Sequence, residues 1–156
     1  VSSFFTYNDD APNTDWNEID IELLGRFPNV VDMNVITNTS HLRTHFTTMN
    51  THIDFQVYGF EWTPEYVAWF INGEEVYRQT DDHIGDLIHP SKIMMNIWNP
   101  SYDDWVGFWD DRVLPRFAAT VSITANMALF LPNCVVGTTQ SPFVHSLLIE
   151  STSGIV

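Results

Sequence analysis

Alternation of apolar and polar residues is the dominant pattern in the first hundred residues, and it is clearest between residues 16 and 25. There Glu18, Asp20 and Glu22 alternate with aliphatic residues. Because successive side chains of a strand point to opposite faces of a sheet, this pattern predicts one acidic and one apolar face. Many half-buried strands carry solvent-facing charges in this way. However, Asp and Glu are poor strand formers and like charges on one face repel, so three together suggest chemistry.

The same two-residue period recurs through much of the chain and predicts a succession of antiparallel strands. Asn72-Gly73, between two such runs, is a strong signal for a type I′ hairpin turn. Residues 92–98 carry apolar side chains on both faces, which predicts a strand buried throughout, in which Asn96 needs a hydrogen-bond partner. This arrangement favours an all-β fold with two antiparallel sheets packed face to face. The expected strands cover residues 1–7, 16–25, 30–37, 55–62, 66–71, 74–79 and 92–98.

Residues 38–54 are polar and hold three of the six histidines. His41 and His45 are four residues apart, but no helical apolar pattern surrounds them, so we expect a solvated loop and no metal site. Cys134 is the only cysteine in the sequence, which leaves no partner for an intrachain disulfide and no basis for a cysteine metal site. We expect no cofactor.

The three carboxylates fit one particular reaction. Glycoside hydrolysis with retention of configuration uses two carboxyl groups about 5 to 5.5 Å apart. On a strand, the Cα atoms of Glu18 and Glu22 would lie about 13 Å apart, so their side chains must lean together over a concave sheet. The charge of Asp20 between them would disfavour ionisation of a neighbour and help to keep Glu22 protonated.

The run Glu18-Ile19-Asp20-Ile21-Glu22 resembles the catalytic signature of glycoside hydrolase family 16. The resemblance extends to VSSFFTY at residues 1–7, FEWTP at 60–64 and KIMMNIWN at 92–99, and it is closest to the bacterial mixed-linkage β-1,3-1,4-glucanases, the lichenases. It implies a concanavalin A-like jelly roll, an antiparallel β-sandwich, and a retaining endo-β-glucan hydrolase. Glu18 would be the nucleophile, Glu22 the acid/base and Asp20 a residue that tunes both. Xyloglucan transglycosylases share the five-residue signature and remain an alternative.

The resemblance also implies where the glucan binds. Core packing is an alternative role for the aromatic residues, and Trp105 and Trp109 could join them in stacking on sugar rings. The family usually has His where this chain has Gln56, which would remove a titrating group near the carboxylates. A catalytically impaired, carbohydrate-binding relative is therefore a second alternative. The expected substrate-binding residues are Phe5, Tyr7, Asn34, Trp62, Asn96 and Trp98.

The charge balance excludes several classes of partner. Six Lys and Arg against 20 Asp and Glu give a formal net charge of −14, which would repel nucleic acid and anionic membrane surfaces. An acidic surface suits a neutral β-glucan, and we expect a monomer. No run approaches the roughly 18 apolar residues of a membrane-spanning helix, and no signal peptide opens the sequence. The resemblance alone implies secretion.

The last 40 residues differ in character from the rest. Glu150 is their only charged residue, and the resemblance to the lichenases stops at about residue 117. We expect residues 1–117 to form a partial catalytic domain, without the family's opening strands, and residues 118–156 to form a divergent tail. The tail could supply strands around residues 121–123 and 143–149, although a loosely packed tail is the stronger expectation. Such an incomplete sandwich should be weakly stable.

Overall fold

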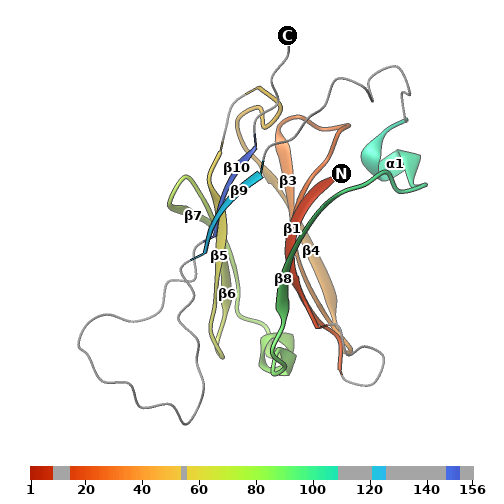
Figure 1. Ribbon diagram of the computed structural model, residues 1–156. Helices are drawn as coiled ribbons and strands as arrows, with labels where there is room; N and C mark the ends of the chain where they lie inside the picture. Colours follow the sequence, from red (N-terminus) through yellow and green to blue (C-terminus); the bar gives the residue numbers. More distant parts are fainter. Residues whose placement is uncertain (9–14, 54–55, 109–120, 126–146, 152–156) are drawn as a thin grey trace.

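The computed structural model describes residues 1–8, 15–53, 56–108, 121–125 and 147–151, which form two larger antiparallel sheets that face each other, a separate two-stranded sheet and short helices (Figure 1). This confirms the all-β sandwich. The five-stranded sheet has the order β4-β3-β2-β1-β8 and the three-stranded sheet the order β5-β6-β7. The elements are β1 (Ser2–Tyr7), β2 (Asn17–Leu23), β3 (Val30–Thr37), β4 (His41–Thr47), β5 (Tyr58–Trp62), β6 (Val67–Ile71), β7 (Glu74–Gln79), η1 (Asp82–Asp86), β8 (Lys92–Ile97), α1 (Asp103–Val106), β9 (Val121–Ala125) and β10 (Leu147–Ser151).

The core lies between the two sheets and is built from the apolar half of each alternating strand. Trp69 of β6 is fully buried, and its Nε1–H donates a 3.0 Å hydrogen bond to the backbone oxygen of Asp20 on the opposite sheet. The sheets are thus joined directly behind the acidic strand. The buried cluster consists of Phe4, Ile19, Ile21, Val31, Met33, Val35, Tyr58, Phe60, Val67, Trp69, Ile71, Ile84 and Leu87.

The hairpin between β6 and β7 turns at Asn72 and Gly73, as the sequence predicts. Their φ angles are +53° and +84°. Both residues are therefore in the left-handed region that a type I′ turn requires, and glycine adopts it without steric cost.

The start of β2 is fixed from outside its own sheet. Asn17 is buried; its Nδ2 donates to the backbone oxygen of Asp86 at 2.9 Å, and its Oδ1 accepts from the backbone N–H of His89 at 2.8 Å. One side chain thus binds both the end of η1 and the segment that leads to β8. These contacts position the strand that carries the three carboxylates.

The expected loop at residues 38–54 is wrong for its first half, because residues 41–47 form strand β4, paired with β3. The strand has a period of two, with exposed His41, Arg43 and His45 alternating with half-buried residues such as Phe46, which packs on the core. A polar strand at a sheet edge buries only its other face, so composition alone suggested a loop.

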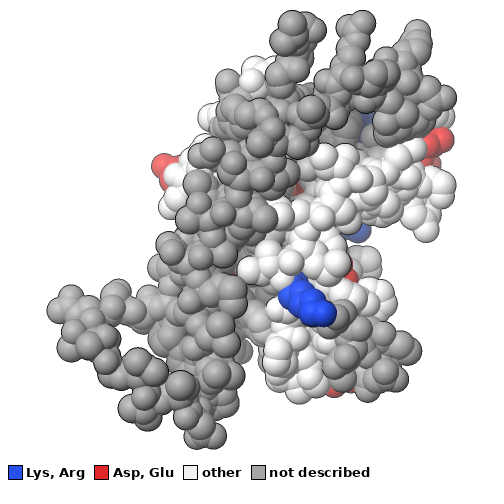
Figure 2. All heavy atoms as spheres, viewed as in Figure 1, with Lys and Arg blue, Asp and Glu red and all other residues white. Residues whose placement is uncertain are grey.

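The expected burial of the strand at residues 92–98 is also wrong. In the described structure β8 pairs only with β1, at the end of the sheet order. Asn96 is exposed, and Ile97 keeps 66% of its surface accessible. Figure 2 shows the described surface over β8 as largely uncharged. Apolar residues on both faces of β8 therefore reflect an edge strand with apolar side chains at the surface.

Two further strands lie in the segment expected to be a divergent tail. β9 and β10 pair with each other in a two-stranded antiparallel sheet, and β10 lies against β5 (Figure 1). In the described structure neither strand joins the hydrogen-bonded ladder of the two larger sheets. The expected strand start at residue 143 lies outside the described residues. No helix of the described part is long and apolar enough to cross a membrane.

Candidate active site

The three carboxylates of β2 lie on the face of the five-stranded sheet that points away from the core. Glu18 lies opposite Tyr7 of β1, and Glu22 lies opposite Asp32 of β3. Asp20 lies between Phe5 of β1 and Asn34 of β3. The strand period thus places acidic and hydrogen-bonding side chains on one surface, which we call the carboxylate face.

Asp20 is the most crowded of the three carboxylates. It is 5% exposed, and Asn34 donates a hydrogen bond from Nδ2 to its Oδ2 at 3.0 Å. Burial raises the pKa of Asp20 well above its usual range; the charges of Glu18 and Glu22 and a side-chain hydrogen bond with Glu18 add to this, and the Asn34 bond opposes it. Asp20 is therefore suited to being neutral between the two glutamates.

Glu22 is also buried, and its pKa is raised as well. It is 8% exposed, and burial raises its pKa from 4.5 to about 7. The Arg43 charge opposes this rise, while the charges of Asp32 and Glu18 support it. The sequence reasoning attributed a protonated Glu22 to the charge of Asp20, whereas the structure attributes the raised pKa first to loss of water and then to the charges of Asp32 and Glu18. A carboxyl that titrates near neutrality can donate a proton in neutral solution.

Glu18 is less buried and is held by a tryptophan that the sequence reasoning did not identify. Trp16 donates from Nε1 to Glu18 Oε2 at 2.7 Å, and its ring meets Tyr7 edge-on with centroids 6.1 Å apart. The contact fixes the orientation of Glu18. The sequence signal for the contact between Trp16 and Glu18 is their i, i+2 spacing, which places both side chains on the same side of an extended chain.

A second group of residues beside Glu22 was also missed. Asp32 is fully buried and accepts hydrogen bonds from His45 Nδ1 and, at 2.9 Å, from Trp105 Nε1. Arg43 lies over the Trp105 ring, 4.9 Å from its centroid. Asp32 alternates with Asn34 along β3, and that repeat of polar residues on one strand face was the available signal.

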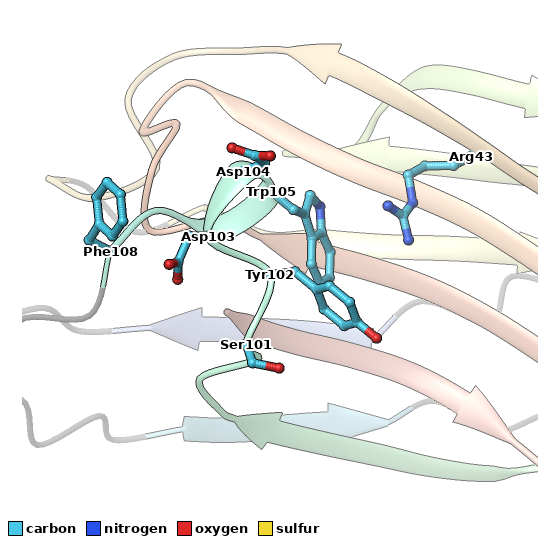
Figure 3. A pocket seen from close by; sticks show the side chains of 7 residues that line it. All are labelled: Arg43, Ser101, Tyr102, Asp103, Asp104, Trp105 and Phe108. Atoms are coloured by element: carbon cyan, nitrogen blue, oxygen red, sulfur yellow. The ribbon is translucent and has the colours of Figure 1, made fainter.

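A hollow of about 720 Å³ opens beside these residues (Figure 3). Arg43 of β4 forms one side, and the segment around α1 forms the other; Figure 3 shows the Tyr102 and Trp105 rings close together, with Arg43 pointing toward them. The volume is in the range of small-molecule sites. The lining residues are Arg43, Ser101, Tyr102, Asp103, Asp104, Trp105 and Phe108.

The expected substrate-binding residues divide into two groups. Phe5, Tyr7, Asn34 and Asn96 occupy the carboxylate face by their strand register. Trp98 follows β8, donates to Ser3 Oγ at 3.4 Å on that face, and meets Trp105 edge-on at 6.2 Å. Trp62 is not brought to this site, because it packs against the core from the second sheet. Trp109 lies outside the described residues.

The side chain of Gln56 has hydrogen-bond partners other than the three carboxylates. Its buried side chain donates from Nε2 to Met49 Sδ at 3.0 Å and accepts from Asn72 Nδ2 at 2.5 Å. Asn72 is at the β6–β7 turn. Gln56 therefore bonds to the β6–β7 turn on one side and to the segment that follows β4 on the other.

The two histidines of β4 have separate partners. His41 Nε2 lies 3.2 Å from Asn34 Nδ2, and His45 bonds to Asp32. Within the described residues, no group of three or more His, Cys, Asp or Glu side chains could hold a metal ion.

Comparison with known proteins places this chain in a family. The model for "Glycosyl hydrolases family 16" matches residues 1–109. A xylanase/beta-glucanase of Ruminococcus flavefaciens is 40% identical over 115 residues, which are 72% of this chain and 14% of that protein. A beta-glucanase of Acetivibrio thermocellus is also 40% identical over 115 residues, 34% of its length.

Solved structures agree with the sequence matches. A prokaryotic beta-1,3-1,4-glucanase (lichenase) from a mouse hindgut metagenome superposes with a TM-score of 0.63 at 43% identity, covering 70% of this chain and 51% of that one. The Bacillus licheniformis beta-glucanase gives 0.63 at 34% identity over the same shares. The chain spans about half of these structures and less than half of the curated relatives. It belongs to glycoside hydrolase family 16.

Proposed function

We propose that this chain carries the catalytic face of a secreted, retaining endo-β-glucan hydrolase that acts on mixed-linkage β-1,3-1,4-glucan. The observation that carries the proposal is the pair of glutamates on one face of β2, with Asp20 between them and the pKa of Glu22 raised to about 7. Relatives described as beta-glucanases and a lichenase support the substrate class.

The two glutamates would share a two-step displacement. The Glu18 carboxylate attacks the anomeric carbon while Glu22 gives its proton to the departing glycosidic oxygen, forming a glycosyl ester on Glu18. Glu22, now ionised, takes a proton from water, which attacks the same carbon and releases Glu18. Two inversions restore the β configuration. A protonated Asp20 would reduce the repulsion between neighbouring carboxylates while keeping its hydrogen bond with Glu18.

The surrounding side chains suit a neutral sugar chain. Phe5, Tyr7 and Trp98 offer apolar ring surfaces on which pyranose rings can stack, and Asn34 and Asn96 offer amides for hydroxyl groups. A net charge of −14 does not repel an uncharged glucan. A polymer of this kind is met outside the cell, which is the reason for proposing secretion.

Incubation of the purified chain with lichenan, with release of reducing ends as the readout, tests this proposal. Glu18→Gln and Glu22→Gln should each lower kcat by about a thousandfold or more and leave the fold intact, because both residues act on one reaction coordinate. Asp20→Asn should be milder, since an amide resembles a protonated carboxyl. Glu74→Gln, at an exposed position of β7, is the matched control and should match the wild type.

Three outcomes would contradict the assignment. Near wild-type turnover in Glu18→Gln would remove the nucleophile from the scheme. Glucan binding without product from the wild-type chain would identify a carbohydrate-binding relative. Transfer between xyloglucan chains without hydrolysis of lichenan would identify a transglycosylase.

A further inference from the structure

Asp32 is a carboxylate of the same face that the two-step reaction does not use. It is 0% exposed and lies directly opposite Glu22 of β2 and His45 of β4. A buried carboxylate needs donors for its oxygens, because removal from water disfavours the charge. Asp32 has one donor for each oxygen: His45 Nδ1–H for Oδ1 and Trp105 Nε1–H for Oδ2.

The bond to Trp105 connects the sheet to the segment that carries α1. This helix has only four residues, and such short helices are unstable without outside contacts. Arg26 supplies one contact, from its guanidinium to the backbone oxygens of Asp103 and Asp104. Asp32 supplies the contact that reaches the aromatic ring itself.

The ring of Trp105 is held from several directions. Asp32 fixes its N–H, the Arg43 guanidinium lies 4.9 Å from its centroid, and Trp98 meets it edge-on at 6.2 Å. The ring lines the hollow next to the carboxylate face (Figure 3). A flat apolar ring with a fixed orientation is suited to stacking on a pyranose.

We propose that Asp32 is a positioning residue for glucan hydrolysis, which anchors Trp105, and with it the α1 segment, beside Glu22 so that a glucose unit stacks on a ring of fixed orientation. This rests on the proposed function. It gives Asp32 two separable effects, one through its hydrogen bonds and one through its charge.

The charge effect acts on Glu22. The charged groups around Glu22 are Glu18 and Asp20 of β2, Asp32 of β3, Arg43 of β4 and the amino group of Val1 before β1, and His45 of β4 lies one strand further, opposite Asp32. Among them the Asp32 charge raises the pKa of Glu22 and the Arg43 charge lowers it. Neutralising Asp32 should therefore lower the pKa of Glu22 and move the alkaline limb of kcat/KM to lower pH.

Steady-state kinetics on lichenan at about pH 5.5 separate the two effects. Asp32→Leu and Trp105→Phe each remove the anchor, and each should raise KM about fivefold or more while kcat changes less than about threefold. The double variant should be no worse than the larger single change, because both break one bond. Asp32→Asn keeps an oxygen that accepts from Trp105 Nε1–H, and its amide nitrogen can donate to Nδ1 of the other His45 tautomer. Its KM should therefore stay within about twofold of wild type, while its alkaline limb shifts. Asp82→Asn, an exposed acid of η1, is the charge-matched control.

Hydrogen exchange gives a readout that does not depend on activity. The Gly107 amide donates to the Asp103 oxygen at 2.8 Å within α1, and its exchange should accelerate about tenfold in Asp32→Leu but not in Asp82→Asn. Unchanged exchange, or additive KM effects in the double variant, would overturn the anchor. An inactive wild type with accelerated exchange would instead overturn the proposed function and the kinetic role of Asp32, while leaving the anchoring contact established.

Discussion

Three carboxylates on one strand acquire different properties because each keeps a different amount of contact with water. Glu22 and Asp20 are buried, and burial is the largest cause of the raised pKa of each. Glu18 is only half-buried and accepts an indole N–H from Trp16. Divergent environments for neighbouring acids are what a pair with separate nucleophile and acid roles requires.

The raised pKa of Glu22 makes the stability of the fold depend on pH. With a pKa of about 7 folded and 4.5 unfolded, the folded state binds more protons between these values, so the free energy of unfolding falls as the pH rises through them. The contribution of Glu22 to the free energy of unfolding is fully present below about pH 4.5, and about 3 kcal/mol of it is lost by pH 8. The free energy of unfolding, measured by chemical denaturation, should differ less between pH 5 and pH 8 for Glu22→Gln than for wild type. An equal difference in both proteins would contradict a buried, protonated Glu22.

The part of the candidate site's geometry that the sequence predicted is the part fixed by local periodicity. Glu18, Asp20 and Glu22 must share a face on any strand, whatever the rest of the fold does. Asp32 and Trp105 are 73 residues apart, and their contact depends on how the α1 segment reaches the sheet. Trp62 packs against the core, and only the arrangement of the sheets, which local periodicity does not give, decides this.

At the scale of elements, exposure at the sheet edges misled the sequence reasoning. β4 looked like a loop because its outward side chains are polar, and β8 looked buried because its outward side chains are apolar. The two-residue alternation of side chains identified β8 as a strand, and the same criterion would have identified β4. Neither the composition of a strand nor the alternation of its side chains tells whether it pairs with a single neighbour, that is, whether it lies at a sheet edge.

The β6–β7 turn gives a test of local backbone strain. Gly73 has a φ of +84°, and a Cβ added there would meet open space. Gly73→Ala should therefore cause no clash and cost only the strain of the left-handed backbone, about 1 to 2 kcal/mol. The thermal midpoint should fall by roughly 2 to 8 °C. Gly85→Ala, also in open space but without a positive φ, is the control, and its thermal midpoint should not fall. Equal midpoints for the two variants would contradict the type I′ turn.

The edge strand β8 gives a test of association. An exposed apolar edge is a template for pairing with another chain, and lysine at such a position discourages it. Ile97→Lys should therefore reduce concentration-dependent scattering without lowering the thermal midpoint. Ile88→Lys places the same change at a residue of similar exposure (67% against 66%) outside the strand, and should have a smaller effect. If both variants scatter alike, net charge rather than the edge controls association.

At the scale of the whole molecule, the sandwich exists because each of its two sheets has one apolar face. Trp69 closes the core beneath Asp20, so packing and chemistry meet on the two sides of a single strand. The sequence predicted this architecture from alternation. It did not predict the sheet order, in which β8 lies beside β1, because residues about 90 apart pair there through long-range contacts.

In the proposed mechanism, Glu18 and Glu22 cooperate through a covalent intermediate on one strand face. Proton NMR of the fresh product of lichenan cleavage tests it most directly, by following the anomeric signal before mutarotation. We expect the first product to have the β configuration, with the α anomer appearing only later at the rate of mutarotation. An α anomer formed first would mean that the two carboxyl groups are too far apart for a covalent intermediate, and would contradict the account.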